Sequence, residues 1–539
     1  MHADIVIVGG GTAGSVLAGR LSEDPALKVL LIEAGPDDRH PLIRVPKGMA
    51  RLLSDPEHTY YYPTTPGRDD IKPEVMLRGR MLGGSSGVNG MVYHRGQPAD
   101  YDRWVELGLP GWGWADMQSC FTAIEDHVLP ETEWRGRGGA VPIRVATTFS
   151  PLLGGILSAA GEQGLPFKEE PNLLNQVGAS SVAENIDACG KRVSASRGFL
   201  TPAVRRRPNL TILTDTLVER IVFDADRKAV GVACRKGSER VEYRAAREVI
   251  LSAGTIISPQ LLQISGVGPG SLLQVLGVPV VHENPGVGAN YRDHYCLQPQ
   301  WRFRHHRDSE NRDLRGWRQG LSALRYMLTR GGPLGYGSHR LSMFASVASD
   351  DGRADAEFLF APYSLEQRPG TEEIQMESEP GGHFALFPLR GTSQGVVEAA
   401  SPDAAAAPTI RPRYLDTQYD RTVTVEAYKL MRRIMLQPVL KPFVVGETGP
   451  FAQAQSDNEI AELALRHGSS AYHSIGTCRM GSDAETGAVL DERLRVRGVQ
   501  GLRVVDCSVM PEQVSANTMG PVLAIAWRAS DIIRADLRA

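Results

Sequence analysis

Residues 4–33 constrain the fold more than any other stretch of the chain. The run "DIVIV" (Asp4–Val8) is short, apolar and β-branched, which is typical of a strand buried on both faces of a parallel sheet. It leads directly into Gly9-Gly10-Gly11-Thr12-Ala13-Gly14, a G-x-G-x-x-G pattern, and then into the helical pattern "SVLAGRLSED". A second apolar run, "KVLLIE", ends at Glu33. This order predicts a βαβ unit at the start of a doubly wound α/β sheet.

Each part of this unit has a physical task in binding a dinucleotide. Gly9 permits the tight turn, Gly11 lets the backbone approach a pyrophosphate, and Gly14 lets the helix pack closely on the strand. The phosphates bind at the positive end of the helix, and Glu33 accepts hydrogen bonds from an adenosine ribose. The pattern does not distinguish NAD from FAD. The sequence has no second G-x-G-x-x-G, which argues against an enzyme that binds FAD and also takes hydride from NAD(P)H.

Bulk properties limit the class of protein. The 539 residues are 42% hydrophobic and 22% charged with 57 glycines, as in a soluble α/β enzyme, and the net charge of -3 predicts no nucleic-acid partner. No apolar run is long enough to span a membrane, and no leader pattern is present, so we expect a cytoplasmic protein. Six cysteines without a C-x-x-C pair predict free thiols and no metal. The adjacent His305-His306 lies in an arginine-rich stretch and is expected to face solvent.

The run "RMLGGSSGVNG" (Arg80–Gly90) allows two interpretations. Gly83 to Gly87 reads as G-x-S-x-G, the turn that presents a serine nucleophile in many hydrolases, which would make Ser85 catalytic. The preceding residues "EVMLRGRML" include two arginines and a glycine and make a poor buried central strand. The other interpretation is that the glycine-rich backbone itself holds a cofactor.

Three long stretches resemble the signatures of the glucose-methanol-choline (GMC) family of FAD oxidoreductases. They are "RGRMLGGSSGVNGMVYHRGQPADYDRW", then "GTIISPQLLQISGVG" (Gly254–Gly268), and finally "YHSIGTCRMG" (Tyr472–Gly481) followed by "LRVVDCSVMPEQVSANTMGP" (Leu502–Pro521). The resemblance implies an α/β fold with a Rossmann-like FAD-binding domain and an inserted α+β substrate domain built on an antiparallel sheet. We place the FAD-binding domain at 1–158, 192–297 and 464–539, and the substrate or cap domain at 159–191 and 298–463. Within the insert, "AEFLFAP", "GGHFALFPL" and "GVVEAAS" are expected to form strands of that sheet.

The resemblance also implies the residues that carry the chemistry. Oxidising an alcohol requires a base at the hydroxyl, because hydride leaves carbon readily only as charge builds on oxygen. His473, the first histidine of H-x-x-G-T-C-R-M-G, is the expected base, and imidazole titrates near working pH. Asn517 is its expected partner and would donate to the developing alkoxide. Asn517 also suits a turn before the helical run "PVLAIAWRASDII", whose positive end we expect to point at the flavin.

The expected cofactor contacts extend over the three matching stretches and the first glycine loop. Val218 matches a position that meets the adenine, Asp506 matches one at the phosphate-ribose end, and Tyr472 is expected to wall the substrate pocket. The full predicted set is Gly9, Gly11, Thr12, Ala13, Gly14, Glu33, Ala34, Gly35, Met81, Leu82, Gly83, Gly84, Ser85, Asn89, Gly90, Met91, Val92, Val218, Ala253, Gly254, Tyr472, Asp506, Cys507, Asn517, Thr518 and Met519.

One position predicts how the cofactor is attached. Some enzymes of the family carry a histidine covalently linked to the flavin where this chain has Val88. Valine cannot form that bond, so we predict non-covalent FAD.

The predicted reaction is oxidation of a primary alcohol to the aldehyde, with proton abstraction by His473 and hydride transfer to flavin N5. Aromatic and furanic alcohols are candidate substrates. The electron acceptor is molecular oxygen or a quinone-type compound, and a monomer or homodimer is expected. Two alternatives stay open: a lyase of the hydroxynitrile type that uses FAD structurally, and a choline- or sugar-type dehydrogenase.

Overall fold

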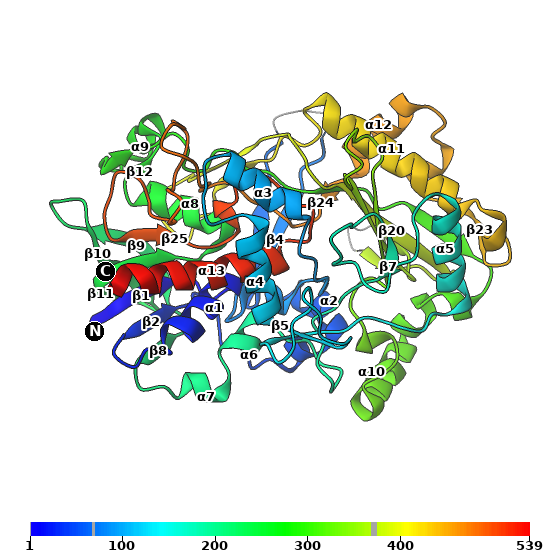
Figure 1. The fold of residues 1–539 in the computed structure, drawn as a ribbon, viewed down its shortest axis with the longest axis horizontal. Helices are drawn as coiled ribbons and strands as arrows, with labels where there is room; N and C mark the ends of the chain where they lie inside the picture. The colour runs from blue at the N-terminus through cyan, green and yellow to red at the C-terminus, as the bar shows by residue number, and fades with distance from the viewer. Residues whose placement is uncertain (1, 67–70, 368–373, 539) are drawn as a thin grey trace.

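The chain folds around two β-sheets that lie at opposite ends of the molecule (Figure 1). The structure is a computed structural model and describes residues 2–66, 71–367 and 374–538. The first sheet has seven strands in the order β8-β2-β1-β11-β10-β9, with β25 paired to β11. Their bounds are β8 Leu210–Leu213, β2 Val29–Ile32, β1 His2–Val8, β11 Glu239–Leu251, β10 Ala229–Lys236, β9 Leu217–Phe223 and β25 Leu502–Val504.

The parallel half of this sheet matches the predicted βαβ unit. Strand β1 pairs in parallel with both β2 and β11, and Ile5 to Ile7 are fully buried. Burial on both faces explains why the sequence there is continuously apolar rather than alternating. The long strand β11 pairs antiparallel with β10 through its first half and parallel with β1 and β25 near its end. The carboxyl ends of β1 and β2 therefore meet at one edge, where ligands bind in open α/β sheets.

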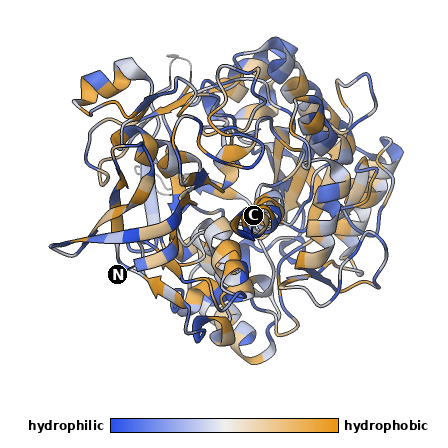
Figure 2. Ribbon diagram, turned by 60° about the vertical axis from the view of Figure 1, so that its left-hand side comes forward, coloured by the Kyte–Doolittle hydropathy of each residue, from blue (hydrophilic) through white to orange (hydrophobic). Residues whose placement is uncertain are grey.

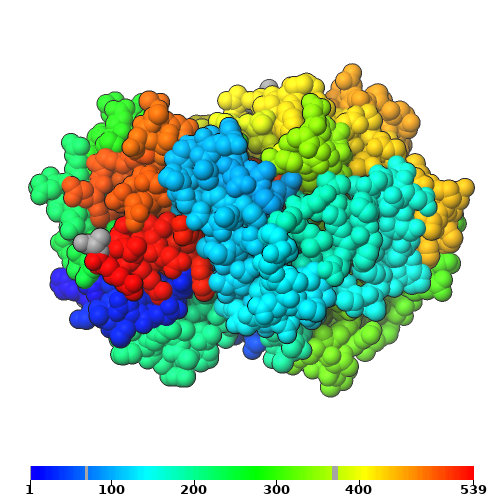
Figure 3. Space-filling model, in the orientation of Figure 1, coloured from blue at the N-terminus to red at the C-terminus, as the bar shows by residue number. Residues whose placement is uncertain are grey.

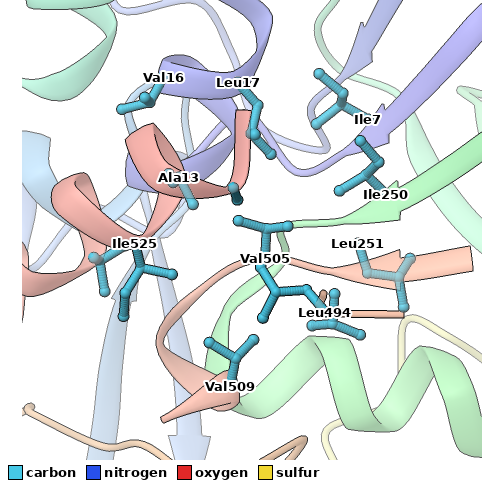
Figure 4. Close-up of a cluster of buried hydrophobic side chains, with 14 of the residues drawn as sticks. Ile7, Ala13, Val16, Leu17, Ile250, Leu251, Leu494, Val505, Val509 and Ile525 are labelled. Atoms are coloured by element: carbon cyan, nitrogen blue, oxygen red, sulfur yellow. The ribbon is translucent and has the colours of Figure 1, made fainter. Parts of the chain in front are cut away.

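Four helices pack beside the first sheet, either on its strands or on one another. They are α1 (Thr12–Leu21), α4 (Trp114–Ile124), α8 (Gly254–Ile264) and α13 (Met519–Arg538), and α1 packs directly on α13. Figure 4 shows part of the core between them, where Ile7 and Ile250 from the strands lie near Leu17 of α1, and Ile525 of α13 lies on the opposite side of the cluster. The two ends of the chain lie together on this side of the molecule, as the adjoining blue and red surfaces in Figure 3 show. The first and last segments of the sequence thus complete one unit.

The second sheet is antiparallel and has six strands in the order β23-β15-β20-β17-β16-β7. Their bounds are β23 Val444–Thr448, β15 Gln300–Phe303, β20 Gly381–Pro388, β17 Ala356–Ala361, β16 Leu341–Ala345 and β7 Gly178–Ser181. The predicted strands "AEFLFAP" and "GGHFALFPL" are β17 and β20. The third, "GVVEAAS", lies instead in a separate pair, β21 (Val396–Glu398) with β22 (Thr409–Arg411).

A second hydrophobic core joins this sheet to the helices α5 (Pro151–Glu162), α11 (Gln418–Met435) and α12 (Asp457–His467). The predicted boundaries at 158 and 463 fall inside α5 and α12, and buried residues of both helices belong to this second core. Both helices thus pack with the second sheet, and the exact domain boundaries stay a prediction. Figure 2 shows hydrophobic residues running through the helices and strands of both units. The two-sheet arrangement confirms the predicted fold class.

The remaining strands form separate pairs outside the two main sheets. The remaining helices are α2 Met49–Leu52, α3 Pro98–Glu106, α6 Ala195–Phe199, α7 Pro202–Arg205, α9 Gly270–Leu276 and α10 Trp317–Thr329. The remaining strand pairs are β3 Thr59–Pro63 with β4 Val75–Gly79, β5 Glu125–His127 with β6 Val141–Ile143, β12 Val267–Gly268 with β13 His282–Glu283, β14 Tyr295–Cys296 with β24 Ser469–Ser470, and β18 Leu365–Gln367 with β19 Ile374–Met376. All six cysteines are free thiols, and the described helices include none that is long and apolar enough to cross a membrane.

Candidate active site

Residues of both units line one cavity of about 1240 Å³. The glycine loop after β1 and the end of β2 form one end, and residues of β17 and β20 contribute to the other. Most of the predicted cofactor residues border this cavity: Gly9, Gly11, Thr12, Ala13, Glu33, Ala34, Gly84, Ser85, Asn89, Gly90, Met91, Val92, Val218, Ala253, Gly254, Tyr472, Asp506, Cys507, Asn517, Thr518 and Met519. Segments far apart in the sequence thus meet around a single space.

The loop after β1 has the geometry that its glycines predict. Gly9 has a positive φ of 99°, and a Cβ there would lie 2.6 Å from the carbonyl oxygen of Ser252. A Cβ on Gly14 would lie 1.9 Å from the Gly9 carbonyl oxygen, so only glycine lets α1 begin at this distance from the strand. A Cβ on Gly11 would meet no atom closer than 3.9 Å, so the backbone there is open to the cavity.

Glu33 lies at the end of β2, as expected. Its carboxylate accepts hydrogen bonds from the backbone N–H of Gly10 and of Gly35, each at 2.8 Å. Burial raises the pKa of this carboxyl, while the two backbone donors act in the opposite direction. The backbone bonds fix the carboxylate beside the glycine loop, where a ribose hydroxyl would approach.

The second glycine run packs against the first. A Cβ on Gly84, whose φ is 51°, would lie 2.8 Å from the Cα of Gly11. Ser85 lies in a 3-10 turn, and its Oγ accepts a hydrogen bond from the Gly79 N–H at 3.1 Å. The strand before it, β4, pairs with β3 in a separate two-stranded sheet, not in the central parallel sheet. The hydrolase interpretation is therefore wrong, because the strand-to-helix turn that it requires is not formed.

Five predicted cofactor residues lie behind the cavity wall instead of on it: Gly14, Gly35, Met81, Leu82 and Gly83. Met81 and Leu82 are buried in hydrophobic clusters. Gly35 lies against the backbone of Arg80, where a Cβ would come within 2.2 Å of a carbonyl oxygen. These residues support the loops that reach the cavity. A sequence motif does not distinguish such supporting residues from residues that contact the cofactor.

His473 and Asn517 meet in the cavity. The Nδ2 atom of Asn517 lies 2.9 Å from Nε2 of His473, and both side chains line the space. The backbone of Tyr472 has a φ of 63°, in the left-handed region, and the next N–H, that of His473, donates to Asp293 at 2.8 Å. A non-glycine residue in this region is uncommon and strained, as often found at functional sites. Tyr472 is 44% exposed at the cavity wall.

Hydrogen bonds fix which nitrogen of His473 is basic. His294 is fully buried, and its Nε2 lies 2.8 Å from the Leu389 carbonyl oxygen, which can only accept, so Nε2 carries the hydrogen. Burial lowers the pKa of His294 to about 4, so its ring is neutral and its Nδ1 accepts. That Nδ1 lies 3.0 Å from Nδ1 of His473, which therefore donates. The free lone pair of His473 is left on Nε2, facing Asn517.

The pKa of His473 is held well below its usual value of 6.5. Burial is the largest cause, followed by electrostatic repulsion from the protonated forms of His294 and Arg78. A neutral imidazole with an available Nε2 lone pair is the form that a general base requires.

The start of helix α13 borders the same cavity. Thr518, Met519 and Val522 all line it, and the Val522 N–H donates to the Thr518 carbonyl in the first turn. The positive end of the helix therefore lies beside the cavity, as the sequence predicts, and its orientation toward a flavin ring stays a prediction.

The motifs did not indicate the residues that close the other end of the cavity. His339, His383, Tyr363 and Phe387 line it and come from the second unit. Burial lowers the pKa of His383 to about 4 and that of His339 well below its usual value. None of these positions lies within the three stretches that resemble the family signatures, and only the fold brings them to the site.

The chain was compared with known proteins. The model of the GMC oxidoreductase family matches residues 3–296 with its N-terminal part and residues 391–526 with its C-terminal part. The chain is a GMC oxidoreductase. It is 36% identical to the oxygen-dependent choline dehydrogenase of Pseudomonas putida, over 98% of this chain and 94% of that protein. It is 37% identical to the mitochondrial choline dehydrogenase of Homo sapiens, over 98% of this chain and 89% of that protein.

Solved structures agree with this assignment. The crystal structure of pyridoxine 4-oxidase from Mesorbium loti matches with a TM-score of 0.87 and 31% identity over 98% of both chains. Formate oxidase matches with a TM-score of 0.91 and 26% identity over 100% of this chain and 99% of the other. This GMC oxidoreductase is therefore an FAD-dependent enzyme that acts on alcohols.

The residues present fit FAD. Gly9, Gly14 and Gly84 hold the two glycine loops close together, where a Cβ would collide, and Gly11 leaves its backbone open to the cavity. Glu33 is fixed for a ribose, and the cavity continues from this end to His473. Val88 also lines the cavity, and its side chain offers no atom for a covalent link. FAD would be held by the loops at residues 9–14 and 83–92 together with the start of α13.

Proposed function

We propose that this GMC oxidoreductase oxidises a neutral primary alcohol to its aldehyde. The observation that carries the proposal is the His473–Asn517 pair, which shares one cavity with the FAD loops and in which the unprotonated Nε2 of His473 lies beside the Asn517 amide. A proton acceptor, His473, beside a hydrogen-bond donor, Asn517, suits removal of a hydroxyl proton.

His473 takes the hydroxyl proton on Nε2. Its Nδ1–H is already donated to His294, so the incoming proton has one place to go, and the resulting imidazolium is stabilised by the neighbouring acceptor. Asn517 presents its Nδ2–H beside Nε2, where it donates to the substrate oxygen as negative charge develops there. When bound, FAD supplies the hydride acceptor, its N5 atom.

The walls of the cavity favour a neutral substrate. Among the described residues, the acids that line it are Glu33, Asp215 and Asp506, all from the FAD-binding unit. Asp506 is already bonded to the Gly254 N–H and to a serine hydroxyl. A quaternary ammonium group is usually recognised by aromatic faces with nearby negative charge. The end of the cavity away from the FAD loops, here called the substrate end, has the rings of Tyr363 and Phe387, but none of these three acids lies there.

His383, at the same end of the cavity, indicates a further feature of the substrate. Nδ1 of His383 lies 2.7 Å from the Tyr363 carbonyl and so carries the hydrogen, which leaves Nε2 as an acceptor. The low pKa of His383 keeps this ring neutral, and the charge of Lys47 is one of the causes. An alcohol with an aromatic or furanic ring and a second O–H or N–H group would suit Phe387, Tyr363 and this acceptor.

Choline is the second candidate substrate, because the choline dehydrogenases named above share more than a third of their residues with this chain over nearly all its length. Molecular oxygen or a quinone-type compound would serve as electron acceptor. A cytoplasmic location and a monomeric or homodimeric state stay predictions from the sequence.

A panel of alcohols tests the proposal. Purified holoenzyme is assayed with benzylic, furanic, aliphatic, choline and sugar substrates, each for peroxide release and for dye reduction. We expect the highest kcat/KM with a neutral ring-bearing primary alcohol. A highest kcat/KM with choline would overturn the neutral-substrate proposal, and no turnover with any alcohol would overturn the reaction itself.

A further inference from the structure

A buried carboxylate lies behind the active site in a position that the reaction does not explain. Glu357, on strand β17, is fully buried, and neither of its oxygens has a hydrogen-bond partner among the described residues. Its ionic neighbour is His94, also fully buried, whose Nδ1 lies 3.1 Å from Oε1 of Glu357. A charge removed from water in this way is costly, so such a group usually has a specific use.

His94 connects this carboxylate to Asn517. Its Nδ1 lies 3.0 Å from Oδ1 of Asn517, while Nδ2 of the same amide lies 2.9 Å from Nε2 of His473. Nε2 of His94 lies 3.3 Å from the Ser342 hydroxyl, and Phe344 packs edge-on against the ring. The order Glu357, His94, Asn517, His473 is therefore a continuous polar chain through an otherwise apolar region.

The orientation of the Asn517 amide depends on where His94 holds its hydrogen. With a hydrogen on Nδ1, His94 donates to Oδ1 of Asn517, and the amide nitrogen must then face His473 and the substrate oxygen. With Nδ1 bare, two acceptors would face each other, and the amide would turn its oxygen toward the reacting hydroxyl. The negative oxygens of Glu357 beside Nδ1 favour the first arrangement.

We propose that Glu357 and His94 are positioning residues that lock the Asn517 amide with its N–H toward the reacting oxygen. The proposal rests on the proposed function of His473 and Asn517. Neither residue lines the cavity, so both act through Asn517 and not on the substrate.

The first test compares kcat and KM in variants that keep side-chain size. Glu357→Gln removes the charge, and we expect kcat to fall about tenfold, the equivalent of one weakened hydrogen bond, with KM nearly unchanged. His94→Asn keeps an N–H near the position of Nδ1 and should retain most of the activity. His94→Gln places its amide near the position of Nε2 instead, so its kcat should fall as much as that of Glu357→Gln.

The double variant separates positioning from packing. An asparagine has no imidazole tautomer to shift, so in the His94→Asn background Glu357→Gln should lower kcat much less than it does alone. A further tenfold loss in that background would overturn the proposal, as would wild-type kcat in Glu357→Gln alone. The control is Glu170→Gln: Glu170 and His127 form another buried pair, 3.2 Å apart, outside the cavity, in which Glu170 also pairs with Arg135, and kcat should not change.

A second measurement needs neither turnover nor a folded variant. Spectra of ¹⁵N-histidine-labelled holoenzyme distinguish the two imidazole nitrogens, and His94 should carry its hydrogen on Nδ1 across the neutral pH range. A hydrogen on Nε2 alone would overturn the proposal. The proposed function fails separately, if His473→Ala keeps wild-type turnover.

Discussion

Replacing His294 tests how the base is held in its active form. In His294→Leu the Nδ1–H of His473 loses its acceptor at 3.0 Å, and the Leu389 carbonyl loses its donor at 2.8 Å. The bond to His294 keeps the His473 hydrogen on Nδ1, and a neutral hydrogen bond is worth about 0.5–1.5 kcal/mol net. Since about 1.4 kcal/mol corresponds to a tenfold change in rate, we expect kcat to fall by up to about tenfold.

A matched variant shows whether the lost acceptor is the cause. His294→Asn keeps an oxygen near the position of Nδ1 that can accept from His473, so its kcat should recover most of the loss. Both variants remove the His294 imidazole, whose protonated form would repel a second charge on His473 and is therefore one cause of the low pKa of His473. The pH at which activity falls on the acid side should therefore rise with asparagine, which keeps an acceptor for the Nδ1–H, whereas kcat at high pH should fall only with leucine.

Steady-state kcat and KM across the pH range, together with FAD content from the visible spectrum, provide the assay. Equal kcat losses in the leucine and asparagine variants would show that packing against Phe387, not the acceptor, matters. Wild-type kcat in His294→Leu would refute the tautomer argument altogether.

Three further predictions concern the cofactor and the pH profile. Because burial lowers the pKa of His473, the base stays unprotonated down through pH 6.5, so kcat/KM should be constant above that pH and fall only below it; a midpoint above 6.5 would contradict the burial argument. Acid precipitation should release FAD into the supernatant because Val88 cannot bond to it, and yellow colour in the pellet would indicate another covalent link. Gly14→Ala, whose Cβ would lie 1.9 Å from the Gly9 carbonyl oxygen, should be purified without FAD; full FAD content would show that the loop can move aside.

The sequence predicted local units better than the contacts between them. The βαβ unit was predictable because strand, glycine loop, helix and Glu33 follow one another in the sequence, and each of them requires particular residue types. His473 and Asn517 were predictable only through a family motif, since an isolated histidine carries no such information. Met81 and Leu82 belong to the same motif, yet they pack in the core and do not reach the cavity.

The supporting residues were not predictable, for a physical reason. His294, His94 and Glu357 come from three distant segments, and their roles depend on distances of about 3 Å that only the packed sheets create. Likewise, His383 faces the substrate end because β20 lies beside β17 in the second sheet. Periodicity identifies strands, but it does not identify which strands become neighbours.

The most direct test of the central claim is anaerobic mixing of the holoenzyme with the best alcohol of the panel, followed by the visible absorption of FAD. The wild-type protein should lose this absorption in a single rapid phase. His473→Ala should contain as much FAD and lose the absorption more slowly by about 10² to 10⁴-fold, the usual contribution of a general base. Equal rates in the two proteins, or persistent absorption in the wild type with every alcohol, would contradict the assignment of His473 as the base of an alcohol oxidation.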